Sequence, residues 1–176
     1  MDAQDAQYSR KPEKGTYLLT LEQSVSLKPQ YAVYRGGIKP IYTIEGDITR
    51  HSFSIRKDGT EVLRLRKKIA KLLTEYTIEK NGQEIAKIKK RISMLTHDYS
   101  GTINGQILEI RADWHACRFD LLIGGRKRCE IEQKKSGFLD RYLILMFDSD
   151  MEDIAAAITV ICDHISDKDD SERENN

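Results

Sequence analysis

A run of nine residues near the C-terminus, 154–162, constrains the fold of this chain more than any other feature. Its sequence, IAAAITVIC, is apolar on every side of a helix, with Thr159 as the one polar side chain. A helix that is apolar all round is buried all round, and a run this short cannot cross a bilayer, which needs roughly 20 apolar residues. We therefore expect the rest of the chain to enclose this helix.

The residues just before this run indicate where the helix begins. Ser149 and Glu152 have the spacing of a capping box, in which each side chain binds a free backbone amide. Asp150 and Asp153 add negative charge near the positive end of the helix dipole. A calcium loop of EF-hand type is excluded, because Asp153 stands where that loop requires glycine. We interpret these acids as helix caps.

Evenly spaced turn dipeptides organise the chain before the helix. They recur in steps of 22, 23, 23 and 20 residues, which leave room for two short strands between turns. Asn-Gly, Asp-Gly and Gly-Gly supply the positive φ angles of two-residue hairpins, and the stretches between them alternate apolar with polar residues. We interpret residues 67–76 as a strand end, a bend and the next strand. The dipeptides are Gly36-Gly37, Asp58-Gly59, Asn81-Gly82, Asn104-Gly105 and Gly124-Gly125.

The chain also repeats itself at an offset of 66 residues without a gap. Phe53 matches Phe119, and Asp47 matches Asp113. The matched residues fall at turn positions and at inward-facing strand positions, so a duplicated β-meander is expected. The two aspartates are expected to serve turns. In a soluble β protein, the place that surrounds a buried helix is the inside of a barrel.

Composition favours one cytoplasmic domain. A length of 176 residues with 39% hydrophobic content suffices for a single core. The polar N-terminus lacks the apolar stretch of a signal peptide. Three cysteines without metal-type pairing indicate a reducing compartment, and the fragment His115-x-Cys117 has no second ligand pair for zinc. We expect a monomer without metal or cofactor.

The net charge of +1 conceals an uneven distribution. Residues 17–147 carry a net charge of +9, whereas residues 148–176 carry −8. A basic body with an acidic tail indicates either an anionic partner or screening of the body by its own tail.

Three segments resemble the LURP-one-related family, which shares the tubby C-terminal-like fold. They are YTIEGDITRHSFSIRKDGTEVLRLRKK, EYTIEKNGQEIAKIKKR and MEDIAAAITVICDHI. The resemblance implies a mainly β protein: a closed antiparallel barrel of about twelve strands in two repeated halves, with residues 152–165 as a central helix. It covers residues 17–166, so 1–16 and 167–176 are expected to be disordered. Tubby proteins of this fold bind phosphoinositides, but their binding residues have no matching motif here.

Two strand segments predict a basic face on the barrel wall. If Leu63, Leu65, Ala86 and Ile88 point inward, the residues between them point outward. Such a face would attract the headgroups of anionic phospholipids; we expect no nucleic-acid partner. The alternative is a solvated wall whose bases protect it from aggregation. The outward residues are Arg64, Arg66, Lys68, Lys87, Lys89 and Arg91.

A second candidate surface comes from the run 142–147, YLILMF, which does not alternate. Both faces of that strand are therefore apolar. Either a neighbouring segment, such as part of residues 1–30, covers its outer face, or Leu143, Leu145 and Phe147 form an exposed patch that binds a protein.

The motifs of nucleotide-binding, serine-hydrolase and zinc-protease sites are absent from the sequence, so no catalytic residue is assigned. We expect a non-enzymatic binding or scaffold protein at the surface of a membrane, with anionic phospholipid as its first partner. A protein–protein adaptor is the alternative, and an enzyme acting on a small ligand comes third.

Overall fold

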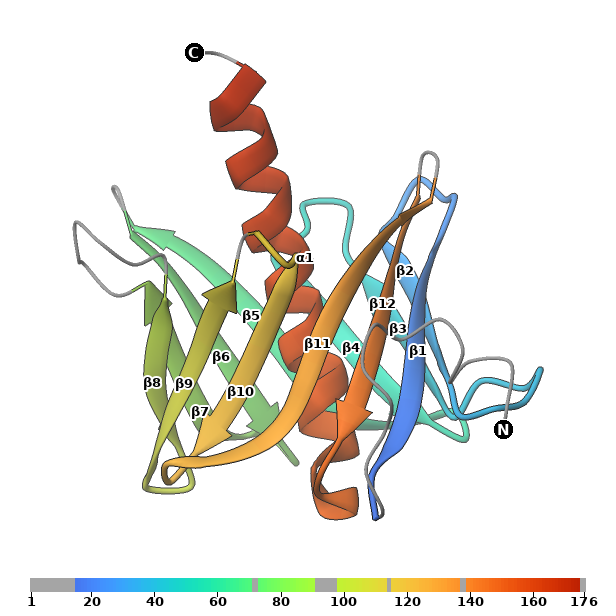
Figure 1. Ribbon diagram of the computed structural model, residues 1–176, viewed down its shortest axis with the longest axis horizontal. Coiled ribbons are helices and arrows are strands. Elements are labelled where there is room, and N and C mark those ends of the chain that lie inside the picture. The colour runs from blue at the N-terminus through green and yellow to red at the C-terminus, as the bar shows by residue number, and fades with distance from the viewer. Residues whose placement is uncertain (1–14, 71–72, 91–97, 114, 137–138, 175–176) are drawn as a thin grey trace.

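The computed structural model describes residues 15–70, 73–90, 98–113, 115–136 and 139–174 of the chain. Within them the strands number twelve and close into an antiparallel barrel around one helix, as predicted (Figure 1). The elements are β1 (Tyr17–Ser24), β2 (Gln30–Tyr34), β3 (Tyr42–Gly46), β4 (Ser52–Lys57), β5 (Thr60–Ala70), β6 (Leu73–Lys80), β7 (Gln83–Lys90), β8 (Tyr99–Ile103), β9 (Gln106–Asp113), β10 (Arg118–Ile123), β11 (Arg126–Ser136), β12 (Leu139–Met146), the 3₁₀ turn η2 (Ser149–Met151) and α1 (Glu152–Glu174).

Each strand pairs with its neighbours in chain order, and β1 closes the barrel against β12. Successive connections therefore alternate between two rims. The lower rim holds the start of α1 and the two-residue turns, and the upper rim is the end from which α1 emerges (Figure 1). The upper rim carries the connections β1–β2, β3–β4, β5–β6, β7–β8, β9–β10 and β11–β12.

The internal repeat is a structural repeat. Ser52–Lys57 corresponds to Arg118–Ile123 at the predicted offset, and β5 and β6 correspond in the same way to β11 and β12. Even the irregularity recurs, because the register shifts after Ile55 in β4 and after Leu121 in β10. A bulge inserts one unpaired residue and sharpens the bend of its strand. The two halves of the wall therefore bend at equivalent points.

The helix fills the barrel. Residues 154–166 of α1 are buried, and the consecutive Ala155, Ala156 and Ala157 let the wall come close on every side. The hydroxyl of Thr159 donates to the carbonyl oxygen of Ala155 at 2.7 Å, so this buried polar group is satisfied within the helix. None of the described helices combines the length and apolarity that a membrane span requires.

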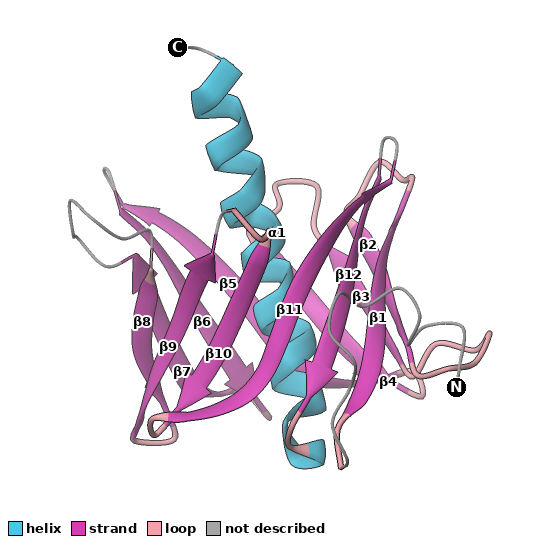
Figure 2. Cartoon of the chain, in the orientation of Figure 1, coloured by secondary structure: helices cyan, strands magenta, loops and turns pink. Residues whose placement is uncertain are grey.

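The helix is longer than the sequence predicted. It continues to Glu174, through most of the segment 167–176 that was expected to be disordered, and its last turns project beyond the upper rim (Figure 2). Once a helix exists, each further residue adds a hydrogen bond at little cost. The buried part of α1 thus nucleates a solvent-side extension that carries acidic residues such as Asp167, which is exposed.

The cap of the helix differs from the predicted capping box. Asp148, not Ser149, is the N-cap, and its carboxylate accepts a hydrogen bond from the amide of Asp150 at 3.1 Å. Glu152 does not fold back on the cap. It accepts a 2.6 Å hydrogen bond from the hydroxyl of Tyr17 and pairs with Arg35. The chain turns through η2 before α1 starts, which shifts the cap by one residue.

A second carboxylate fixes the other end of the buried segment. Asp163 is buried and accepts hydrogen bonds from the hydroxyls of Tyr31 at 2.7 Å and Tyr142 at 2.9 Å. Burial raises the pKa of Asp163 to about 6; the bond from Tyr31 opposes this rise, and the charge of Asp167 adds to it. Glu152 and Asp163 together hold α1 in one position along the barrel axis.

We predict that Asp163 makes the protein more stable in mild acid. A carboxyl whose folded pKa lies above its unfolded value contributes stability that is lost as pH rises through the folded pKa. Between about pH 5 and pH 7.5 this amounts to about 1 kcal/mol. Denaturant unfolding at the two pH values should show this gain for the natural chain and a smaller one for Asp163→Asn. Equal gains in both proteins would contradict the assignment.

Gly101 generates a second stability prediction. It pairs with Ile88 on β7, and a Cβ at this position would lie 1.7 Å from the backbone oxygen of Lys87. Gly101→Ala should therefore lower the free energy of unfolding by about 2 kcal/mol or more, as overpacking does. Gly37→Ala is the control, since its nearest neighbour would be 3.9 Å away. A Gly101→Ala protein with unchanged denaturant midpoint would refute this close approach of the strands.

Candidate functional site

The basic face lies on the outside of β5, β6 and β7. Leu63, Leu65, Ala86 and Ile88 are buried in the core as predicted, so the bases between them point outward. Arg66, Lys68, Lys87 and Lys89 are exposed, and Arg64 is half-buried. Arg91, the sixth predicted member, lies outside the described residues. The structure thus places five bases on β5 and β7, on either side of β6.

Acids that the sequence reasoning did not include lie among these bases. Arg64 pairs with Glu61 at 2.7 Å, and Arg66 pairs with Glu79 at 2.8 Å. Glu75 binds Lys87 at 3.2 Å and Lys89 at 2.9 Å. The alternation of β6 could have predicted these acids. Tyr76 and Ile78 are buried, so Glu75 and Glu79 lie on the outer face with the bases of β5 and β7.

These acids cancel part of the positive charge of the basic face. The hydrogen bond from Lys89 lowers the pKa of Glu75, and that from Arg64 lowers the pKa of Glu61. Glu84 of β7 is exposed opposite Glu79 and adds a fourth acid. Five bases facing four acids leave an excess of one positive charge on this face. Exposed ion pairs contribute little, about 0–1 kcal/mol each. An incoming anion can therefore replace a carboxylate here at small cost.

A shallow depression runs along the same face. It has a volume of about 300 Å³ and lies between β5 and β6, beside the Asn81-Gly82 turn. Its charged lining consists of Glu61, Arg64, Arg66 and Glu79. The two guanidinium groups, which offer paired donors suited to phosphate oxygens, are the groups that could hold an anion there.

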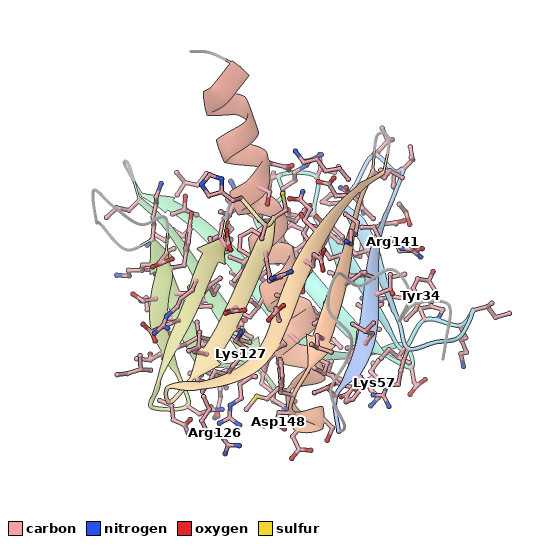
Figure 3. The ribbon with its side chains drawn as sticks, in the orientation of Figure 1. Tyr34, Lys57, Arg126, Lys127, Arg141 and Asp148 are labelled. Atoms are coloured by element: carbon pink, nitrogen blue, oxygen red, sulfur yellow. The ribbon has the colours of Figure 1, made fainter. Side chains whose placement is uncertain are left out.

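The equivalent face of the second half is different. On β10 and β11, Arg118 pairs with the buried Glu130 at 3.0 Å, and Lys127 contacts both Asp120 at 2.8 Å and Glu130 at 3.2 Å. Lys127 lies on the outer side of this wall (Figure 3). Opposite charges are matched within the wall here. The fold therefore does not require a basic face, and the excess positive charge belongs to the first half.

The expected apolar patch is not an exposed surface. Leu143 and Leu145 are buried, and they form a small cluster with Leu18 on the outer side of β1 and β12. Only Phe147 of the three predicted residues is exposed, at 40%. Of the two options for this strand, a covered outer face is the one observed. The run 142–147 lacks alternation because both faces of β12 are buried.

The described residues include one group of acids close enough to share an ion. Asp140, Asp163 and Asp167 place carboxylate oxygens within 4.8 Å of one another near the upper rim. Asp163 is held by Tyr31 and Tyr142, and Asp140 accepts a hydrogen bond from Gln133 at 2.9 Å. We interpret this cluster as part of the packing of α1. Cys117 is exposed and forms no disulfide, and it does not belong to this group of acids.

The two repeat-related aspartates serve turns, as predicted. Asp47 accepts hydrogen bonds from the amides of His51 at 2.8 Å and Ser52 at 3.3 Å. Asp113 accepts one from the amide of Ala116 at 3.2 Å. Each carboxylate caps the connection that follows its own strand, β3 or β9. This shared turn role accounts for their equivalent positions, and no catalytic role is needed.

The architecture agrees with what comparison with known proteins finds. The family model described as LURP-one-related matches residues 19–163, which is nearly the whole barrel and the buried part of α1. A search among curated proteins finds no match to this chain. The matched span includes every strand from β2 to β12, both repeated halves and the apolar helix. The chain belongs to the LURP-one-related family.

Proposed function

We propose that this protein is a non-enzymatic binding protein that attaches peripherally to anionic phospholipid surfaces through its basic face. The observation that carries the proposal is the placement of Arg64, Arg66 and Lys68 on β5 and of Lys87 and Lys89 on β7, on the outer faces of the two strands that flank β6. Their excess positive charge is directed to one side of the barrel, where a charged plane can meet all of them.

Weak internal pairing supports this use of the face. The side chains of Arg66, Lys87 and Lys89 are about half exposed even while paired with Glu79 and Glu75. Each base near an anionic membrane contributes about 1 kcal/mol of attraction, which is comparable with or larger than an exposed ion pair. Lipid phosphates can therefore compete with the carboxylates for these side chains. The three free cysteines are in keeping with the cytoplasmic side of the membrane.

The alternatives receive less support. An adaptor that uses Leu143, Leu145 and Phe147 would have to bind side chains of which two are buried. An enzyme that uses Asp47 and Asp113 would need carboxylates that instead cap turns. The basic face is the predicted surface that remains available to a partner.

We predict that the protein binds vesicles of phosphatidylcholine mixed with phosphatidylserine, and that added salt weakens this binding because salt screens charges. Replacing Arg66, Lys87 and Lys89 together by glutamine should weaken vesicle binding by roughly a hundredfold, because three attractions of about 1 kcal/mol are lost. Co-sedimentation with the vesicles over a lipid titration measures this change.

A matched control removes the same total charge elsewhere. Lys39, Lys57 and Arg126 are exposed near the lower rim, where Figure 3 shows Lys57 and Arg126. Their joint replacement by glutamine should leave vesicle binding within about twofold of the natural chain, since the basic face is intact. Equal loss in both triple variants would mean that net charge alone acts, and would overturn the basic face as the site.

A further inference from the structure

The two rims of the barrel differ in a way that its fold does not require. At the lower rim, β4–β5, β6–β7, β8–β9 and β10–β11 are joined by two-residue turns that offer little side-chain surface. The seven-residue β2–β3 connection, which carries Ile38, is also at the lower rim. At the upper rim, the five-residue connections β1–β2 and β3–β4 carry large apolar side chains, and others stand at the ends of β5 and β6. Of the eight large apolar residues exposed among the described ones, five lie at this rim. They are Val25, Leu27, Ile48, Ile69 and Leu73, which we call the apolar rim.

These five residues lie on two connections, β1–β2 and β3–β4, and at the neighbouring ends of β5 and β6. Val25 and Leu27 belong to the β1–β2 connection, and Ile48 belongs to β3–β4. Ile69 and Leu73 flank the β5–β6 connection. Leu27 is 100% and Ile48 75% exposed, so neither packs on the protein itself. Single exposed apolar residues are ordinary on protein surfaces, but such a concentration at one end is not.

Main-chain hydrogen bonds tie the β1–β2 connection, the β3–β4 connection and the end of β5 into one platform. The amide of Gly46, at the end of β3, donates to the carbonyl oxygen of Pro29 at 2.8 Å. The amide of Lys67 donates to the carbonyl oxygen of His51 at 2.7 Å. Asp47 further holds the tip that carries Ile48. The side chains of the apolar rim are thus presented in fixed positions, which lowers the ordering cost of docking.

Bases accompany the apolar residues at every connection. Lys28 follows Leu27, Arg50 lies two residues after Ile48, and Lys68 precedes Ile69; all three are exposed. Lys68 also belongs to the basic face, so that face continues into the rim. Apolar tips mixed with bases suit the boundary between the acyl chains and the anionic headgroups of a bilayer.

We propose that the apolar rim inserts into the surface of an anionic bilayer while the adjoining basic face of β5–β7 turns toward the headgroups. This inference rests on the proposed function and names the part of the molecule that enters the lipid. A flat bilayer is the occupant that fits, because Ile48 of the β3–β4 connection and Ile69 and Leu73 at the ends of β5 and β6 stand on separate elements above the basic face. One tilted plane meets these three side chains and the basic face together, whereas a compact protein pocket would enclose only one of the elements.

The acidic extension of α1 sets the orientation. The helix projects beyond the upper rim (Figure 1), and residues 167–174 contain five acids and two bases. Anionic headgroups repel this segment. The barrel therefore docks tilted, with the β3–β6 side of the rim nearest the lipid and the helix axis inclined toward the membrane plane, so that the acidic segment does not point into the headgroups. This tilt is the one that brings the basic face to the membrane.

The test compares two matched double variants for binding to phosphatidylcholine–phosphatidylserine vesicles. Ile48→Ser with Ile69→Ser removes apolar surface from the rim. Ile38→Ser with Ile107→Ser removes the same side chains from exposed positions elsewhere. All four residues are exposed, so both variants should melt like the natural chain. The rim variant should bind roughly a hundredfold more weakly, about tenfold for each isoleucine no longer inserted, and the control variant should bind like the natural chain.

A spectroscopic readout locates the insertion directly. The natural chain's emission spectrum is subtracted from that of each tryptophan variant. The remaining emission of Ile48→Trp should shift to the blue when these vesicles are added, whereas that of Ile38→Trp should not. If the natural chain binds no vesicles, the proposed function fails and this inference fails with it. If it binds, and the rim variant binds as tightly or both double variants weaken equally, the basic face stands and only the inserted rim is overturned.

Discussion

The burial of one apolar helix inside the barrel is the constraint on which the rest of this structure depends. The wall cannot stand alone, because the inward side chains of twelve strands need a filled interior. The helix cannot stand alone either, since Ala155, Val160 and Ile161 lie on different sides of it and all are buried. Each supplies the apolar surface that the other requires. Folding of wall and helix should therefore be one cooperative event.

Two carboxylates fix the position of α1 inside the apolar interior of the barrel. Glu152 at the start of α1 is held by Tyr17 and Arg35, and Asp163 at the upper end is held by tyrosines from β2 and β12. A purely apolar cylinder could slide or rotate within a ring of apolar side chains. Buried polar groups resist this because each must keep its partners. Asp163 adds a modest dependence on pH, since burial raises the pKa of its carboxyl.

Much of the fold was predictable because it depends on local rules. Turn dipeptides need positive φ angles, which Asp58, Asn81 and Asn104 adopt. The internal sequence repeat corresponds to equivalent strands in the two halves, and even a bulge recurs at the same offset. The features that the sequence did not reveal depend on residues of neighbouring strands. Glu75 and Glu79 reduced the charge of the basic face from an adjacent strand, and Leu143 proved buried on the outer side of the wall. The apolar rim could not be predicted from the sequence, because Ile48 and Leu27 lie on different connections. Only the fold brings these connections to the same rim.

The most direct test of this account is the thermal unfolding of the chain truncated before Ser149, which keeps the whole wall and loses the helix. We predict that this protein loses the cooperative transition of the full chain and binds a dye that reports exposed apolar surface, because the inward side chains then face an unfilled interior. A truncated chain that melts in one sharp transition without binding the dye would show that the wall folds without its helix, and would contradict the central claim.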